Sequence, residues 1–331
     1  MFDIFCYIVP PKYKEAVFRV APADAHVRRQ YNVVKGLTDL EQRFRIMDRY
    51  EGLVQVLSIA DPAIHTFAPP KEAVEIARLA NDEMAELVEK FPDRFIGAIA
   101  TLPLNDMDAT VSEAERAIME LGFRGVSMYT DVNGVSIDAP QFMPLYETMT
   151  RFNLPILLQP WRSASVPDYP AETRSNYRIS LIFGWPYETS AAMTHLVFSG
   201  VLDKYPDLKI VTHHCGGMVP YFAGRIAGAY AQAEKVHGEH FVRQLKKPVL
   251  DYFRMFYADT AVAGNTAALM CGYDFFGPDH ILFGSDMPFD YQLGDRNTRE
   301  TIRAIERMAI SESDKRRILE ENARRVLRLP A

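Results

Sequence analysis

The chain has 331 residues, of which 48% are hydrophobic and 24% are charged, and its formal net charge at pH 7 is −6. These values are typical of a globular protein with a substantial core, and an acidic chain without a basic block is not expected to bind nucleic acid as its main partner. Its three cysteines, which are not closely spaced, do not make a disulfide framework. No apolar stretch approaches the roughly 18 residues that span a bilayer and no signal peptide is evident, so we expect a cytoplasmic protein without a membrane partner.

Taken in order, the chain alternates apolar segments of strand length with segments of helical spacing. Residues 12–38, which follow Pro10 and Pro11, are expected to be irregular. Strands are expected over residues 2–9, 53–59, 95–102, 125–129, 155–159, 209–212, 256–260 and 281–284. Helices are expected between them, over residues 40–50, 71–91, 107–121, 141–152, 188–202 and 265–270.

About eight such alternations, with no internal repeat and no flexible linker, indicate an α/β protein with a parallel sheet covered by helices. A closed barrel fits this count better than an open sheet. No glycine-rich phosphate-binding fingerprint follows any of the expected strands. We therefore expect a single domain over residues 1–331.

Two strand ends carry residue types that do chemistry. The strand over 209–212 runs directly into His213 and His214, and the strand over 281–284 delivers Asp286. Catalytic groups of α/β barrels lie where strands end. We therefore predict that His214 and Asp286 form an acid/base pair, in which the carboxylate orients the imidazole and raises its pKa. The alternative is that the two histidines are satisfied inside the core.

Five segments together resemble the amidohydrolase-related family that includes 2-amino-3-carboxymuconate-6-semialdehyde decarboxylase and the hydroxybenzoate decarboxylases. The segments follow the family's order along nearly the whole chain and cover residues 95–103, 120–126, 157–161, 214–226 and 281–289. The resemblance implies a distorted (β/α)₈ barrel, a homodimer, and one divalent metal, often zinc. It also implies that the protein is a lyase or hydrolase.

The family's metal ligands are mostly replaced in this sequence. The family's His-x-His pair at the end of the first strand falls on Phe5 and Tyr7, and its third histidine falls on Gln159. Among the ligands only Asp286 matches, while His214 matches the position of the family's catalytic acid/base. The resemblance therefore implies a degenerate metal site.

A divalent site needs three or four donors that converge at about 2.0–2.3 Å, and Phe5 offers none. We therefore expect no cofactor. The alternative is a rearranged zinc site that uses Asp286 with His213 or His214. Adjacent strand residues face opposite ways, however, so His213 is expected to turn away from His214.

Hydrogen bonds are expected to replace the metal's action on the substrate. Tyr7 is predicted to act in catalysis as a donor to a substrate oxygen, and Gln159 to bind the substrate as a second donor. The alternative for Tyr7, and the favoured interpretation for Phe5, is a side chain that only fills the space. The resemblance also leaves open that Arg43 or Arg45 reaches the pocket.

The segment between the strand ending at residue 159 and the helix expected from residue 188 is predicted to bind the substrate. It has few helix signals and carries several aromatic and basic side chains. Trp161 and Tyr177 offer flat faces for an aromatic ring. Arg174 and Arg178 each offer a guanidinium that can clamp a carboxylate through two hydrogen bonds.

The leading hypothesis is a metal-independent enzyme that decarboxylates or hydrolyses a small aromatic or conjugated carboxylate, with carbon–carbon bond cleavage favoured. One alternative is a zinc-dependent enzyme of the same family with a rearranged site. Another is an inactive barrel that binds a small ligand. The survival of His214 and Asp286 argues against an inactive barrel, because a relaxed site would lose them as readily as the other ligands.

Overall fold

The computed structural model describes residues 1–23, 25–239 and 244–329. Its parallel strands form two sheets. The first has the order β1 (Phe2–Ile8), β2 (Val54–Ile59) and β3 (Phe95–Ala98). The second has the order β4 (Val126–Tyr129), β7 (Ile156–Gln159), β8 (Ile210–Thr212) and β9 (Tyr257–Ala258).

Isolated parallel bridges join the two sheets into a ring. They link β3 to β4, then β9 to the segment after residue 280, and finally this segment back to β1, through the pairs Ala100–Val126, Ala258–Ile281 and Cys6–Met287. The eighth strand, predicted over 281–284, is therefore an extended segment that is held by single bridges. The described residues contain seven parallel strands, and this segment closes the ring, so the predicted distorted (β/α)₈ barrel is confirmed.

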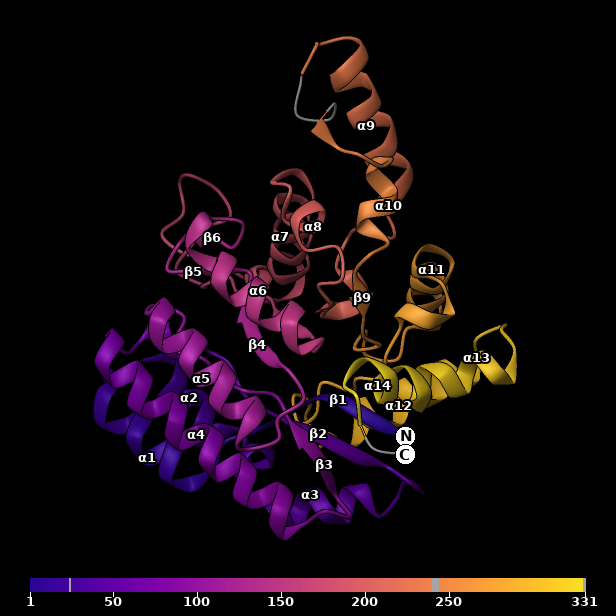
Figure 1. Ribbon diagram of the computed structural model, residues 1–331. Helices are drawn as coiled ribbons and strands as arrows, with labels where there is room; N and C mark the ends of the chain where they lie inside the picture. The colour runs from indigo at the N-terminus through magenta and orange to yellow at the C-terminus, as the bar shows by residue number, and fades with distance from the viewer. Residues whose placement is uncertain (24, 240–243, 330–331) are drawn as a thin grey trace.

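Helices surround the strands (Figure 1). The longer ones are α3 (Leu40–Met47), α4 (Pro70–Lys90), α5 (Met107–Met119), α6 (Met143–Phe152), α7 (Trp185–Phe198), α9 (Ala223–Lys235), α11 (Thr266–Phe276) and α12 (Asp295–Glu306). Shorter ones are α8 (Val201–Lys204), α10 (Val249–Phe253), α13 (Glu312–Arg316) and α14 (Asn322–Val326), and a small hairpin is formed by β5 (Asp131–Val132) and β6 (Val135–Ser136). In α4, Ala73, Ile76, Ala80 and Met84 are buried at helical spacing, as expected for a helix that packs one face on a sheet.

The prediction that residues 12–38 are irregular is wrong. They contain α1 (Pro11–Val20) and α2 (His26–Val33). Pro11 occupies the first turn of α1, where its missing N–H costs no hydrogen bond and its fixed φ suits a helix. A Pro-Pro pair therefore began a helix here instead of preventing one. Within the described residues, no helix combines the length and the apolar character that crossing a membrane requires.

Arg43 and Arg45 have opposite environments on α3. Arg43 is buried and contacts β1 and β2. Its Nη1 atom donates to Oε1 of Gln55 in β2 at 2.8 Å, and its Nη2 atom donates to the carbonyl oxygen of Tyr7 in β1. Arg45 is more than half exposed and pairs with Glu41 one turn away. The suggestion that one of these arginines reaches the pocket is not supported, because Arg43 binds the backbone of β1 and Arg45 faces solvent.

Replacing Arg43 with alanine should lower the free energy of unfolding by about 3 kcal/mol, because a buried carbonyl and a buried amide lose their charged donor. The same change at Arg45 should stay within about 0.5 kcal/mol, since an exposed ion pair contributes little. Urea unfolding followed by circular dichroism measures both values. Equal effects of the two substitutions would contradict a structural role for Arg43.

Candidate active site

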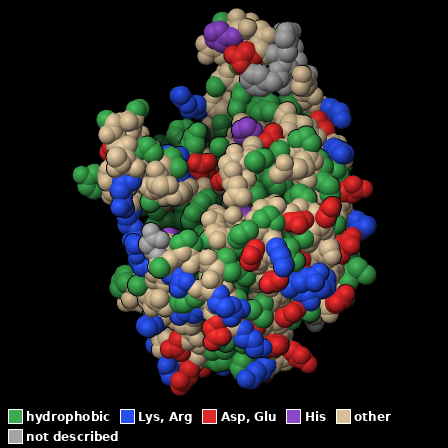
Figure 2. All heavy atoms as spheres, turned by 90° about the vertical axis from the view of Figure 1, so that its left-hand side faces the viewer, with side chains coloured by type: hydrophobic (Ala, Val, Ile, Leu, Met, Phe, Trp, Pro, Cys, Tyr) green, Lys and Arg blue, Asp and Glu red, His purple; other side chains and the backbone are tan. Residues whose placement is uncertain are grey.

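A cavity of about 2100 Å³ opens at the carboxyl ends of the strands. Its lining includes Tyr7 and Gln159, which lie near the ends of β1 and β7, as well as His213 and Asp286, which follow β8 and the eighth extended segment. Figure 2 shows this hollow in one face of the molecule, with hydrophobic side chains in its depth. Active sites of such barrels lie at this end, so the cavity is the candidate active site.

His213 and His214 both line this cavity, and the expectation that they face opposite ways is wrong. Alternation of side chains holds only within a strand, and β8 ends at Thr212. His214 then takes a left-handed backbone conformation with φ of 54°, which turns its ring toward that of His213. The two ring centroids are 3.9 Å apart.

The turn after the two histidines depends on a glycine. Gly217 has φ of 62°, and a Cβ atom there would lie 2.5 Å from the carbonyl oxygen of Pro186. Only a residue without a side chain fits this close approach to the start of α7. The contact brings Trp185 to the pocket, where its ring centroid lies 6.4 Å from that of His214.

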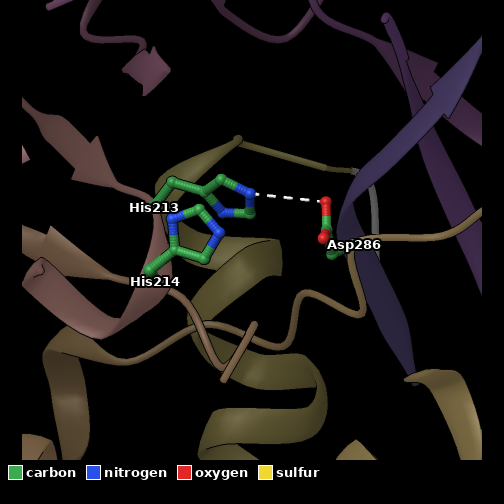
Figure 3. A group of neighbouring side chains, drawn as sticks. All are labelled: His213, His214 and Asp286. Atoms are coloured by element: carbon green, nitrogen blue, oxygen red, sulfur yellow. Dashed lines mark ion pairs between the residues drawn. The ribbon is translucent and has the colours of Figure 1, made fainter. Parts of the chain in front are cut away.

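Asp286 faces both histidines across the cavity (Figure 3). Its Oδ1 atom lies 3.5 Å from Nε2 of His213. One ligand atom each from His213, His214 and Asp286 can be chosen so that all three lie within 4.8 Å of one another, an arrangement that can hold a metal ion. The predicted acid/base pair of His214 and Asp286 is thus brought into one group. The prediction that Asp286 raises the pKa of His214 is wrong, because the carboxylate pairs with His213 and the pKa of His214 is lowered. The role of the pair in catalysis stays a prediction.

The replaced ligand positions surround this group. The Tyr7 hydroxyl donates to Oε1 of Gln159 at 2.8 Å and lies 3.5 Å from Nε2 of His213. The Nε2 atom of Gln159 is buried and has no hydrogen-bond partner among the described residues. The ring of Phe5 stacks on His213 with 4.5 Å between centroids and an angle of 8°. Phe5 therefore packs against an imidazole instead of binding a metal.

The protonation states of the two histidines differ. Burial disfavours a charged His213, but the nearby carboxylates of Asp259 and Asp286 outweigh burial and raise the pKa of His213 to about 10. Burial, together with the neighbouring His213, lowers the pKa of His214 well below its usual value. Burial and the charge of Asp286 raise the pKa of Tyr7 far above its usual value. At neutral pH His214 is therefore neutral, and Tyr7 keeps its proton and remains a donor.

The other predicted substrate-binding residues line the cavity at different depths. Trp161 is partly buried, and its ring centroid lies 6.5 Å from that of Trp185, so the two indoles form one wall. Arg174, Tyr177 and Arg178 lie at the rim and are exposed, with Tyr177 91% exposed. Substrate contacts by these three stay predictions.

Two residues of the site were missed by sequence reasoning. Asp259 follows β9 directly, is fully buried, and contacts Nδ1 of His213 through Oδ2. The rule that identified Asp286, an acidic residue at a strand end, applies equally to Asp259. Trp185 had no such signal, because its approach to His214 depends on the turn at Gly217.

Known proteins resemble this chain over most of its length. A family profile described as Amidohydrolase matches residues 23–329. The chain is 28% identical to 2-amino-3-carboxymuconate-6-semialdehyde decarboxylase of Dictyostelium discoideum over 287 residues, 86% of this chain and 75% of that protein. It is 32% identical to gamma-resorcylate decarboxylase of Polaromonas sp. (strain JS666) over 296 residues, 87% of each.

A solved structure bears on the metal. The structure of dihydroxybenzoic acid decarboxylase from Polaromonas sp. JS666, with bound manganese and the inhibitor 2-nitroresorcinol, matches with a TM-score of 0.78 and 27% identity, covering 99% of this chain and 96% of that chain. Together with the group of His213, His214 and Asp286, this finding shows that our expectation of no cofactor is wrong. The prediction failed because it assumed that the side chain of His213 points away from the pocket.

The residues present fit a divalent ion. Nδ1 of His213 is occupied by Asp259, which leaves Nε2 to face the carboxylate of Asp286 inside the pocket. Histidines that bind a metal usually have a carboxylate at their other ring nitrogen. The predicted class, a lyase or hydrolase of the amidohydrolase type, is confirmed by the relatives. With a family match over residues 23–329, the chain belongs to the amidohydrolase family.

Proposed function

We propose that the protein is a metal-assisted decarboxylase of a small aromatic carboxylate. The observation that carries this proposal is the convergence of His213, Asp286 and Tyr7 in a cavity that also has an indole wall. The two relatives named above are a 2-amino-3-carboxymuconate-6-semialdehyde decarboxylase and a gamma-resorcylate decarboxylase. Carboxylates on aromatic or conjugated frames are therefore the substrate class to expect.

Nε2 of His213 and the carboxylate of Asp286 would hold the metal, with the amide oxygen of Gln159 as a further donor nearby. Nε2 would lose its proton when the metal binds, because a histidine ligand must be neutral. When bound, a divalent ion supplies positive charge that holds the substrate carboxylate and stabilises developing negative charge. A metal held by these residues would still be open to oxygen atoms of the substrate. Oxygen donors such as these suit manganese as well as zinc.

His214 would move the proton. Decarboxylation breaks the bond between the ring carbon and the carboxylate, leaves the electron pair on the ring carbon, and releases CO₂. That carbon must then take up a proton. The His214 imidazole can accept a proton from a substrate hydroxyl or from water and deliver it to the carbon. Its ring lies between those of His213 and Trp185, beside the cavity.

The remaining side chains would orient the substrate. The indoles of Trp161 and Trp185 offer flat faces to an aromatic ring. The Tyr7 hydroxyl and the free Nε2 of Gln159 can donate to substrate oxygens in the depth of the pocket. Arg174 or Arg178 at the rim can attract a negatively charged acid toward the cavity.

Protein stripped of metal with a chelator should be inactive on hydroxybenzoic and dienoic acids, and manganese or zinc chloride should restore turnover with one CO₂ released per acid consumed. The reason is that the carboxylate needs the ion to hold it. Liquid chromatography with mass spectrometry identifies the decarboxylated product. Activity that survives chelation would contradict the metal, and a hydrolysis product without CO₂ would contradict decarboxylation.

In the metal-loaded enzyme, His214→Asn should lower kcat by about 10²–10⁴-fold, the usual contribution of a general acid/base. Tyr7→Phe should cost less, about tenfold to a hundredfold, because it removes one hydrogen bond to a developing charge. Steady-state rates on an acid that the wild type turns over measure both. Wild-type rates in His214→Asn would remove this residue from the proton transfer.

We also propose that the protein forms a homodimer through α9. This helix extends away from the barrel (Figure 1), and none of its side chains is buried. Tyr221, which lies just before it, is 79% exposed, and Phe222 is 38% exposed. The ring of Tyr230 on α9 packs on that of Phe198 in α7, with 4.6 Å between centroids, and exposed aromatic groups such as those before α9 mark interaction sites. A second copy of the chain is the simplest partner for such a surface.

Light scattering after size-exclusion chromatography should give twice the chain mass for the wild type. Tyr221→Glu should shift the protein toward monomer, because it places a charge in the proposed interface. Met119→Glu is the matched control, since Met119 is 72% exposed at the end of α5, and it should leave the mass unchanged. A monomeric wild type would refute the dimer.

A further inference from the structure

The two adjacent histidines of the pocket are held in different ways. His213 is 2% exposed, and a carboxylate lies next to each of its ring nitrogens. Nδ1 contacts the carboxylate of Asp259, and Nε2 lies near the carboxylate of Asp286. His214 is only partly buried, and its Nδ1 atom has no hydrogen-bond partner in the described part of the chain. One imidazole is therefore fixed at both ends, while the other has no polar group that orients it through Nδ1.

Asp259 is itself held firmly. It is fully buried, and its Oδ1 atom accepts hydrogen bonds from the backbone N–H groups of Cys215 at 2.9 Å and Ala261 at 3.1 Å. Its own N–H donates to the carbonyl oxygen of Thr212 at 3.1 Å. With Oδ1 occupied in this way, Oδ2 is directed at Nδ1 of His213. Asp259 therefore fixes which nitrogen of His213 faces the pocket.

Phe5 restricts the same ring from its face. The two rings are nearly parallel, with an angle of 8° and 4.5 Å between centroids. A bond at Nδ1 and an aromatic face together leave His213 one orientation, in which Nε2 lies 3.5 Å from Oδ1 of Asp286 and 3.5 Å from the Tyr7 hydroxyl. A metal-bound histidine usually has a carboxylate at its other ring nitrogen. Asp259 takes that place at Nδ1 of His213, which leaves Nε2 as the nitrogen that faces the pocket.

We infer that His213 is a metal ligand through Nε2 and that Asp259 is its positioning residue, while His214 is not a ligand. This inference rests on the metal-assisted function proposed above and assigns unequal roles to neighbouring residues. Orienting partners of metal-bound histidines contribute about 10- to 100-fold to metal affinity, whereas loss of a ligand costs more.

Isothermal titration of chelator-stripped protein with manganese chloride, without substrate, tests the assignment. His213→Asn should weaken binding by more than about 100-fold, and Asp259→Asn by about 10- to 100-fold. His214→Asn, in the same pocket and next in the chain, is the matched control and should stay within about threefold of the wild type.

A double variant separates positioning from simple charge. If Asp259 acts through His213, then Asp259→Asn should change the manganese affinity of the His213→Asn protein by less than about twofold, because the two changes disable one unit. If Asp259 only adds negative charge near the ion, its effect should persist in that background. Thermal unfolding of each variant shows which proteins are folded. Should Asp259→Asn not fold, the comparison of His213→Asn with His214→Asn still decides which histidine is the ligand.

The outcomes distinguish this inference from the proposed function. A wild type that binds manganese but decarboxylates no acid of the set would refute the proposed function and leave the ligand assignment standing. A wild type that binds manganese, with His214→Asn as damaging to binding as His213→Asn, would overturn the inference alone. Wild-type affinity in Asp259→Asn would remove the positioning role. A wild type that binds no manganese or zinc would overturn the ligand assignment together with the metal.

Discussion

The contact between the Asp259 carboxylate and Nδ1 of His213 fixes the geometry on which the pocket depends. Both side chains are buried, and burying charge is costly unless the charge is paired and its remaining lone pairs are satisfied. The backbone N–H groups of Cys215 and Ala261 satisfy them here. These donors belong to the loops after β8 and β9. One carboxylate therefore holds both loops in place and also fixes the orientation of the His213 imidazole.

Backbone conformation directs the functional side chains as much as the strands do. His214, Cys215 and Asp286 all have left-handed φ values, of 54°, 55° and 62°. For residues other than glycine this conformation costs on the order of 1 kcal/mol or more and persists only where the surroundings enforce it. Asp286 is held by its N–H, which donates to the carbonyl oxygen of Phe5 at 2.9 Å. These unfavourable backbone conformations therefore occur after β8 and after the eighth segment, where the side chains of His214 and Asp286 must turn toward one cavity.

The barrel was predictable because alternating apolar and amphipathic segments reflect burial directly, and His214 and Asp286 were found because they end two of those segments. The direction of His213 was not predictable in this way. Strand alternation applies only as far as the strand continues, and the sequence does not mark that β8 stops at Thr212. Helical spacing likewise could not predict that Arg43 is buried while Arg45 faces solvent. The burial of Arg43 depends on its hydrogen bond to a backbone carbonyl oxygen of β1, which the sequence does not show.

Position 5 of β1 carries no metal-binding side chain, whereas His213 after β8 can bind a metal. These two features are related, because the side chains of Phe5 and His213 are in contact. Phe5 provides no lone pair, but its flat ring supports the imidazole of His213 face to face. An imidazole in place of Phe5 would set a second polar ring against one that already lies between two carboxylates. Position 5 is fully buried, and a buried polar ring costs free energy unless its nitrogens are hydrogen-bonded. The apolar residue at position 5 and the histidine at 213 are thus mutually consistent, and the polar centre of the cavity lies nearer to β8 and β9 than the sequence pattern of the family implies.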